Sequence, residues 1–180
     1  YLVNKLFPDM DLHASTQMNI NNLNGALIAK ELGFKRIVLA RETDLEELKN
    51  IRKNCDIEIE VFIHGSLCVC QSGQCLMSSL NGDRSANRGR CAQPCRKDYK
   101  IILANETINS KLSYLSPKDL CTIDNVDEIA KYCDSLKIEG RMKSKEYVYS
   151  IVKSYREKLD NGKYYYYLDE VKNRGFTKGL

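Results

Sequence analysis

The sequence predicts an α/β fold, a partial (β/α)8 barrel of the TIM type with a cysteine-rich loop after one strand. Short apolar runs rich in β-branched residues alternate with helical patterns about every 25 residues, which is typical of βα units around a parallel sheet. Polar residues follow each expected strand, where the active sites of such barrels form. Four convincing βα units are visible. The chain would therefore be half a barrel that starts partway through, and a small doubly wound sheet is the competing architecture.

In the first third of the chain, strand and helix patterns alternate. The expected elements are a strand over 11–14, a helix over 21–32, a strand over 35–40, a helix over 45–51 and a strand over 57–63. Ile28 and Leu32 lie on an apolar face that further leucines and alanines widen, so we expect the first helix to be well buried and to end at Gly33. Thr43 is the expected N-cap of the second helix, because Glu46 three residues later completes a capping box.

The remainder of the chain continues with mixed elements. They are a hairpin over about 99–115, a short helical turn over 116–120, a helix over 125–132, a buried strand over 135–138 and a helix over 144–159. Two alternating runs around a polar centre indicate the hairpin. The closing run 163–168 holds consecutive tyrosines, which favours a strand with one tyrosine face buried over a binding platform.

Composition narrows the class of protein. With 180 residues, 43% of them hydrophobic and 29% charged, the chain is expected to be a soluble protein with one core. No run approaches the roughly 18 to 20 apolar residues of a membrane helix, so we expect no membrane insertion. The first residues lack a signal-peptide pattern and an initiating Met, which predicts a cytoplasmic protein or a piece of one. A secreted disulfide framework would also suit eight cysteines, but the Lys-rich helices and βα repeats argue against it.

The net charge of +4 is concentrated in one segment. Between Asp83 and Lys100 six basic residues face two acidic ones, and the rest of the chain is balanced. A solvated basic loop would explain this excess. Its position beside four cysteines favours an anionic occupant or partner.

Those four cysteines, spaced C-x6-C-x15-C-x3-C, are Cys68, Cys75, Cys91 and Cys95. Structural zinc sites usually show two close Cys pairs, and only the last two residues form one here. A 4Fe–4S cluster tolerates unequal spacing because its irons present separate corners. Spacing alone favours a metal centre over disulfides or coincidence, with the metal undecided. Cys70 is a fifth thiol that would either replace Cys68 as a ligand or pack in the loop.

Three arginines adjoin these cysteines, namely Arg88, Arg90 and Arg96. Because an iron–sulfur cluster with four thiolate ligands is anionic, these cations would stabilise it and tune its potential. The remaining cysteines lie on helical or helix-end segments, where buried apolar thiols are expected. They are Cys55, Cys121 and Cys133.

Polar side chains stand at the expected strand ends. They are His13 and Gln17 after the first strand, Arg41 and Glu42 after the second, His64 after the third, and Glu139 and Arg141 after the strand over 135–138. A helix cap or a hydrogen-bonded buried group would explain any single one equally well. The whole set, which includes both histidines of the chain, predicts a catalytic centre in which a histidine acts as general acid or base.

Seven segments carry a family resemblance. They are HASTQ at 13–17, VLARE at 38–42, EVFIHGSLCVCQSGQCLMS at 60–78, RSANRGRCAQPCR at 84–96, LSPKDLC at 115–121, SLKIEGRMK at 135–143 and NRGFTKG at 173–179. In order and over nearly the full length, they closely resemble peptidase family U-32, the collagenase-like peptidases. The match is highly specific for that reason.

The resemblance implies a barrel-like catalytic domain whose first strands are missing. Residues 1–180 would be its C-terminal part, with a cysteine-rich insertion at about 64–98. Some members of the family were described as collagen-degrading. Others are oxygen-independent hydroxylases that carry a 4Fe–4S cluster and act on transfer RNA, ribosomal RNA or the ubiquinone ring. In the RNA-modifying members, prephenate is implicated as a hydroxyl source. Their cluster cysteines correspond to Cys68, Cys75, Cys91 and Cys95, and the chain departs from the family at Cys70, where a small residue is more usual.

We therefore expect an iron–sulfur-dependent hydroxylase that acts on RNA with prephenate as co-substrate, and whose aerobic samples hold zinc or no metal. Proteolysis is the alternative that the family name states. The sequence contains no H-E-x-x-H, G-x-S-x-G or Ser–His–Asp signature. A Cys–His pair such as Cys68 with His64 would have to supply the nucleophile. Ubiquinone-ring hydroxylation and a non-catalytic scaffold are further alternatives. Expected partners are RNA, a peptide under the proteolytic alternative, and a second copy of the chain if a fragment exposes strand edges.

Overall fold

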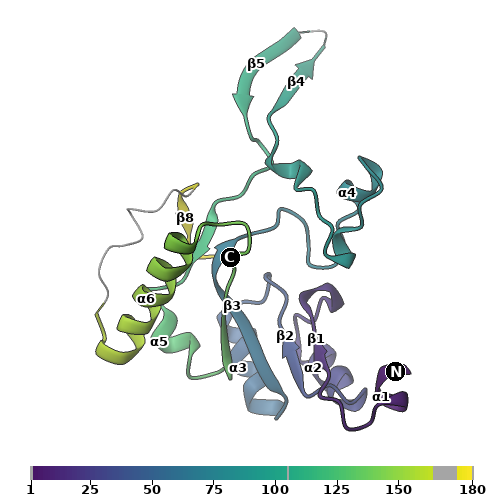
Figure 1. Ribbon diagram of the computed structural model, residues 1–180, viewed down its shortest axis with the longest axis vertical. Coiled ribbons are helices and arrows are strands. Elements are labelled where there is room, and N and C mark those ends of the chain that lie inside the picture. Colours follow the sequence, from purple (N-terminus) through teal and green to yellow (C-terminus); the bar gives the residue numbers. More distant parts are fainter. Residues whose placement is uncertain (1, 105, 164–173, 180) are drawn as a thin grey trace.

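The computed structural model describes residues 2–104, 106–163 and 174–179, and for 106–112 it describes the backbone alone. These residues form a mixed α/β fold whose main sheet is rich in parallel pairs (Figure 1). The strands of that sheet are β1 (His13–Ala14), β2 (Arg36–Val38), β3 (Glu58–Ser66), β6 (Asp119–Cys121), β7 (Ser135–Ile138) and β8 (Phe176–Thr177). The expected α/β class is confirmed.

β3 is the central strand of the sheet. β1, β2, β3 and β7 run parallel, and Glu60 pairs with a residue of β2 and with one of β7, so these two strands lie on opposite edges of β3. β6 runs antiparallel to the end of β3, where His64 pairs with β6 on one edge and with β7 on the other. β2 and β6 therefore share one edge of β3, at its two ends. Residues 61–63 of β3 lie in the gap between them.

The two faces of β3 differ because successive side chains of a strand point to opposite sides. Ile59 and Ile63 are buried in the apolar core. The alternate residues form ion pairs across strands: Glu58 Oε2 lies 2.8 Å from Arg36 Nη2, and Glu60 Oε1 lies 2.7 Å from Lys137 Nζ. The alternation of Ile and Glu along this strand thus separates an apolar face from a charged face.

The helices of the described ranges are α1 (Leu2–Leu6), α2 (Leu23–Glu31), α3 (Leu45–Asn54), α4 (Met77–Leu80), α5 (Val126–Ile129) and α6 (Lys145–Asn161). Four of them, α2, α3, α5 and α6, pack against the apolar face. Ala26 of α2 and Ile51 of α3 pack with β1, β2 and β3 in one part of the core, and Val126 of α5 and Ile151 of α6 pack with β3 in another. None of the helices in the described ranges has the length and apolar character that a bilayer span requires.

α2 is less buried than its composition predicts. Ala26 and Ala29 are fully buried, whereas Ile28 and Leu32 are 57% and 43% exposed. Apolar residues surround this helix, so the sequence does not define one core-facing stripe. The two alanines face the core, with Leu23 packed beside them, and Ile28 and Leu32 face outward.

The N-cap of α3 is Asp44, and the expectation of Thr43 is wrong. Asp44 Oδ1 accepts a hydrogen bond from the backbone N–H of Glu47 at 2.8 Å. A carboxylate at this position also interacts favourably with the positive end of the helix dipole. Glu47 does not complete a capping box, because its carboxylate accepts a hydrogen bond from Leu23 N at 2.8 Å and so links α3 to the start of α2.

Two further segments differ from expectation. Asp119–Cys121 is strand β6 and not part of a helical turn, because it pairs with the end of β3. The helix expected over 125–132 ends at Ile129. Most of the tyrosine-rich run 163–168 lies outside the described residues.

β4 (Tyr99–Leu103) and β5 (Glu106–Leu112) form the expected antiparallel hairpin, separate from the main sheet. In Figure 1 this hairpin projects away from the sheet. Residues 67–98, hereafter the cysteine loop, connect β3 to the hairpin and contain α4 and two short 3-10 turns, Ala86–Arg88 and Pro94–Arg96.

Candidate functional site

The cysteine loop is attached to the ends of β1 and β2 by residues expected at the site. The Glu42 carboxylate accepts hydrogen bonds from the backbone N–H of Ser72 and from its hydroxyl, the latter at 2.9 Å. The backbone N–H of Arg41 donates to the same hydroxyl at 3.3 Å. A Cβ on Gly73 would lie 2.3 Å from the carbonyl oxygen of Gln17, so only glycine allows this approach. Ser72 and Gly73 lie between Cys70 and Cys75. These contacts therefore hold the thiols of the loop beside the strand ends.

The two halves of the cysteine loop are bonded to each other. Asn87 Nδ2 donates to the carbonyl oxygen of Gly73 at 2.8 Å. The backbone N–H of Ala92 donates to the buried hydroxyl of Ser78 at 2.7 Å. These bonds fold the segment with the last two cysteines back onto the segment with the first ones.

The four cysteines expected as ligands are free thiols. Cys68 and Cys91 are exposed, and Cys75 and Cys95 are half-buried. Burial raises the pKa of the Cys95 thiol, the Arg96 guanidinium beside it opposes the shift, and the other three thiols add to it. In the described ranges, however, no three His, Cys, Asp or Glu side chains form a group that could hold a metal ion, so ligation stays a prediction.

The chemistry of these donors fits an iron–sulfur cluster, because four thiolates are its usual protein ligands. Cys70 belongs to the same group of thiols. Burial raises the pKa of Cys70, and the neighbouring Cys75 and Cys68 thiols raise it further. Cys70 therefore remains an alternative ligand on the first half of the loop.

Arg96 fixes the far end of the cysteine loop. Its guanidinium donates to Ser116 Oγ at 2.7 Å, to the carbonyl oxygen of Pro117 at 2.8 Å and to the carbonyl oxygen of Leu67. One side chain thus connects the loop to the end of β3 and to the segment before β6. This structural role is additional to the charge that we expected it to offer a cofactor.

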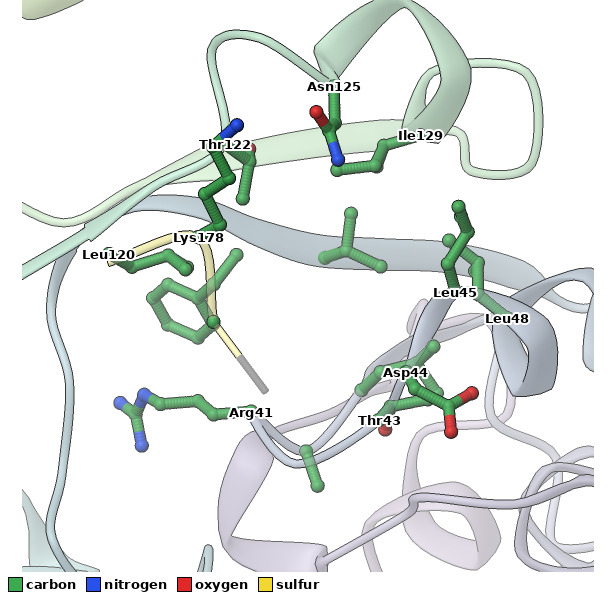
Figure 2. A pocket seen from close by; sticks show the side chains of 15 residues that line it. Arg41, Thr43, Asp44, Leu45, Leu48, Leu120, Thr122, Asn125, Ile129 and Lys178 are labelled. Atoms are coloured by element: carbon green, nitrogen blue, oxygen red, sulfur yellow. The ribbon is translucent and has the colours of Figure 1, made fainter. Parts of the chain in front are cut away.

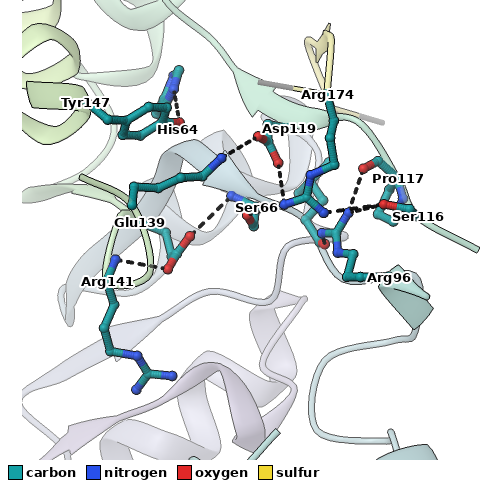
Figure 3. Close-up of polar contacts among 12 residues, drawn as sticks. His64, Ser66, Arg96, Ser116, Pro117, Asp119, Glu139, Arg141, Tyr147 and Arg174 are labelled. Carbon is teal, nitrogen blue, oxygen red and sulfur yellow. Dashed lines mark hydrogen bonds and ion pairs between the residues drawn. The ribbon is translucent and has the colours of Figure 1, made fainter. Parts of the chain in front are cut away.

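A buried carboxylate that sequence reasoning missed lies at the start of β6. Asp119 is fully buried, with Oδ2 3.2 Å from Lys143 Nζ and Oδ1 3.6 Å from Arg174 Nη2 (Figure 3). Arg174 also donates to Ser66 Oγ at 3.2 Å and to Ser116 Oγ at 3.3 Å. The signal was present in the sequence, since Asp119, Lys143 and Arg174 each lie within one of the family-like segments, and a charged residue in a buried strand requires partners.

Glu139 joins the end of β7 to the end of β3. Its backbone N–H donates to the carbonyl oxygen of His64 at 2.9 Å. Its carboxylate accepts hydrogen bonds from the backbone N–H groups of Ser66 at 3.4 Å and Arg141 at 3.2 Å. Gly65 has a φ of +116°, and a Cβ there would lie 2.5 Å from the Glu139 carbonyl oxygen. Figure 3 shows the Arg141 guanidinium extending away from these contacts, and the residue is exposed.

His64 is enclosed in the core beneath these groups. Its Nε2 lies 3.0 Å from the Tyr147 hydroxyl and its Nδ1 3.4 Å from the Tyr155 hydroxyl. Burial lowers the pKa of His64 to about 4, so the imidazole is neutral near pH 7. Burial also raises the pKa of Tyr147 to about 12.

The expected site residues thus separate into two groups. Gln17, Arg41 and Glu42 contact the cysteine loop, and Glu139 contacts Ser66, which directly precedes it. His13, Arg88, Arg90 and Arg141 are exposed and form none of these contacts.

A thiol-rich loop anchored at the ends of parallel strands is therefore the principal chemical feature of the chain. The family model described as peptidase family U32 matches residues 1–180. The chain belongs to peptidase family U32. The U32 match includes the whole cysteine loop and all four strand ends discussed above.

Relatives of this U32 chain carry different names. A protein of Methanocaldococcus jannaschii named an uncharacterized protease is 40% identical over 94% of the chain and 46% of its own length. A tRNA hydroxylation protein of Bacillus subtilis is 40% identical over 87% of the chain and 39% of its own length. A 23S rRNA 5-hydroxycytidine synthase of Escherichia coli is 41% identical over 85% of the chain and 24% of its own length. The chain thus spans less than half the length of these relatives, and no solved structure matches it.

Proposed function

We propose that this U32 protein is an iron–sulfur-dependent, oxygen-independent enzyme that hydroxylates a base of transfer or ribosomal RNA. The names of two relatives support RNA hydroxylation. The observation that carries the proposal is the attachment of the cysteine loop, through Ser72 and Glu42, to the ends of parallel strands. Barrel enzymes place their active sites at that edge. The parallel strands β1, β2, β3 and β7 are consistent with part of a (β/α)8 barrel with the cysteine loop inserted after β3.

The proposed ligands of a 4Fe–4S cluster are Cys68, Cys75, Cys91 and Cys95. When bound, the cluster would transfer electrons and activate an oxygen-bearing donor, for which we propose prephenate. Arg88 and Arg90 are exposed on the same loop and would bind a carboxylate or a phosphate group through charge-assisted hydrogen bonds.

Residues at the strand ends would orient the substrate. The Glu139 carboxylate is fixed by two backbone N–H groups and would orient the substrate or shuttle a proton. The exposed Arg141 would bind an anionic group of the substrate or donor. His13 is exposed and would act as a general acid or base, whereas the burial of His64 favours a structural role for that residue.

Anaerobic reconstitution with iron and sulfide tests the cluster. We expect a brown protein with about four irons per chain. Replacement of Cys75 or Cys91 by Ser should reduce the iron content, and the control Cys133→Ala, which lies outside the loop, should not. A wild-type chain that stays colourless and iron-free after reconstitution would contradict the proposal.

Mass spectrometry of RNA nucleosides tests the reaction. A strain that lacks the protein should lack one hydroxylated nucleoside, and the wild-type gene should restore it. Glu139→Gln should restore much less product, and Glu146→Gln, an exposed change on α6, should restore the normal amount. Unchanged product with Glu139→Gln would remove that residue from the proposed site.

Proteolysis is the second candidate, because the archaeal relative is named a protease. The suggested Cys–His pair requires that His64 approach Cys68, yet His64 is fully buried beside two tyrosine hydroxyls. We therefore expect no cleavage of gelatin by the metal-free chain. Cleavage that Cys68→Ala abolishes would favour the peptidase.

A further inference from the structure

A cavity of about 170 Å³ lies where β2 and β6 leave the gap on the edge of β3. Its apolar walls come from α3, β3 and β6, and they include Leu45, Leu48, Val61, Phe62 and Leu120 (Figure 2). Apolar cavities of about 150 Å³ in other proteins bind benzene. The cavity therefore has room for a single six-membered ring.

Two buried polar atoms in the wall of this cavity have no hydrogen-bond partner in the described part of the chain. They are Thr43 Oγ1 and Arg41 Nε. An unpaired buried donor is unfavourable, and buried polar groups in folded proteins are nearly always hydrogen-bonded. Both atoms can donate a hydrogen bond, so a ligand with acceptor oxygens would satisfy them.

The cavity has two cations at one end and mainly apolar side chains at the other. Figure 2 shows Arg41 and Lys178 at the first end and Leu45 and Leu48 at the second, where Thr43 and the Asp44 carboxylate also lie. Asp44 Oδ1 accepts the N-cap hydrogen bond of α3 from the backbone N–H of Glu47. Lys178 Nζ lies 3.1 Å from Asp124 Oδ2 and its side chain is 69% exposed, so the cation is accessible from solvent. This distribution suits a ligand that combines a flat ring, a ring carbonyl oxygen and a negatively charged group.

We infer that this cavity binds the pyrimidine base of the RNA substrate after the base has left its stack. The inference rests on the proposed function, because an enzyme that modifies a base must reach it outside the duplex. A pyrimidine ring matches the volume, the Thr43 hydroxyl donates to a ring carbonyl oxygen, and the adjoining phosphate meets Arg41 and Lys178. A purine has two fused rings and fills more of the space than the single ring that this volume suits.

The position of the cavity agrees with this assignment. Arg41 lines the cavity, and its backbone N–H donates to Ser72 Oγ on the cysteine loop at 3.3 Å. A base held in the cavity therefore lies beside the loop that we propose as the cluster site. The relative named for 5-hydroxycytidine acts, by that name, on a pyrimidine.

Methyl NMR of the full chain tests binding directly, with cytidine, uridine and adenosine monophosphates and benzoate as probes at equal millimolar concentrations. We expect a pyrimidine nucleotide to shift the methyl signals of Leu45, Leu48 and Val61, and adenosine monophosphate to leave them unchanged. Benzoate distinguishes a small aromatic acid from a nucleotide. Shifts by benzoate that equal or exceed those by the pyrimidine nucleotides would overturn the inference, as would the absence of any shift by a pyrimidine nucleotide.

Two variants make the test specific. Thr43→Val keeps the shape and removes the unpaired hydroxyl, so it should weaken pyrimidine nucleotide binding about tenfold while the melting temperature stays equal or rises. A structural role for the hydroxyl would instead lower the melting temperature. Ala40→Leu should fill the cavity and abolish binding, and Ser150→Ala, a hydroxyl deletion on α6, should leave binding unchanged. Wild-type affinity in Thr43→Val would overturn the inference.

The same variants separate this inference from the proposed function. RNA that is hydroxylated at the normal level by the Ala40→Leu protein would refute the base site and leave the reaction intact. Nucleotide binding that depends on Thr43, in a protein whose absence changes no RNA nucleoside, would refute the reaction and retain the site.

Discussion

Asp119 illustrates how a single residue organises the edge of the site. Solvent does not reach this carboxylate, which lies between the cations of Lys143 and Arg174. A buried charge persists only where its partners compensate for lost hydration. Asp119 therefore positions Arg174, whose guanidinium contacts both Ser66 and Ser116 at the base of the cysteine loop.

Asp119→Asn should destabilise the fold by about 3 kcal/mol, since the shape is kept but two cations lose their counter-ion. Urea unfolding followed by circular dichroism measures the change. Asp56→Asn serves as the control, because Asp56 forms an exposed ion pair with Lys30 and its loss should not alter the midpoint detectably. Equal midpoints for Asp119→Asn and the wild type would show that the buried pairing does not hold the edge together.

His64 should make stability depend on pH in a defined window. Its pKa falls from 6.5 to about 4 on folding, so the unfolded chain binds a proton at a higher pH than the folded chain does. The stability that the neutral imidazole contributes is therefore fully present above about pH 6.5 and is lost as the pH falls toward 4, by up to about 3 kcal/mol.

His64→Gln tests this dependence, because the amide does not titrate. Urea midpoints measured between pH 7.5 and pH 4.5 should fall more steeply for the wild type than for the variant, whatever the absolute stability of each. His13→Gln, an exposed change, should retain the wild-type slope. Parallel pH profiles for His64→Gln and the wild type would contradict the buried, neutral assignment.

At the scale of elements, local signals predicted those segments whose structure depends on neighbours in the sequence. β7 occupies the expected range Ser135–Ile138, and α6 starts after the Ser144 cap. β6 was missed because it forms by pairing with the end of β3, far away in the sequence. The burial of α2 was overestimated because its apolar residues surround the helix, and only the packing selects Ala26 and Ala29.

The same distinction applies to the candidate site. The rule that barrel sites lie at strand ends singled out Gln17, Arg41 and Glu42 as candidate catalytic residues. In the structure these residues contact the cysteine loop, and their catalytic role stays a prediction. The contacts themselves depend on the path of a long irregular loop. Neither the role of Arg96 as a tether nor the Asp119 pairing follows from spacing along the chain.

Two glycines of the cysteine loop provide a matched test of its attachment. Gly73 and Gly89 have φ angles of +75° and +71°, so alanine at either position adopts the same unfavourable backbone conformation. A Cβ at Gly73 would lie 2.3 Å from the Gln17 carbonyl oxygen, whereas nothing lies within 4 Å of one at Gly89. Gly73→Ala should therefore detach the loop, and Gly89→Ala should add backbone strain alone.

Limited proteolysis and thiol labelling with a chromogenic disulfide report loop attachment. Gly73→Ala should be cleaved faster within the loop and should label its half-buried Cys75 and Cys95 faster than Gly89→Ala does. Similar rates in the two variants would show that the Gln17 contact does not secure the loop.

At the scale of the whole molecule, the gap on the edge of β3 results from topology. β2 and β6 are separated by the entire cysteine loop and hairpin in sequence, yet they occupy the same edge. No local pattern encodes such a gap, and the cavity within it was not predicted. The clustering of positive charge, in contrast, is a property of composition, and the sequence located it between Asp83 and Lys100.

Under the proposed function, this charge distribution should determine how the affinity for RNA depends on salt. Each phosphate neutralised by a basic side chain releases counter-ions. The logarithm of the binding constant therefore falls linearly with the logarithm of the salt concentration, with a slope of about 0.7 per contact for a single strand. The double variant Arg88→Gln, Arg90→Gln removes two exposed charges of the cysteine loop, so the slope should decrease by about 1.4.

Fluorescence anisotropy with a labelled RNA stem–loop, measured over a range of salt concentrations, provides the slope. The double variant Lys145→Gln, Lys163→Gln changes the net charge equally, at exposed positions at the start of α6 and beyond its C-cap, and should leave the slope unchanged. If both double variants reduced the slope equally, RNA would respond to the net charge of the molecule and not to the cysteine loop.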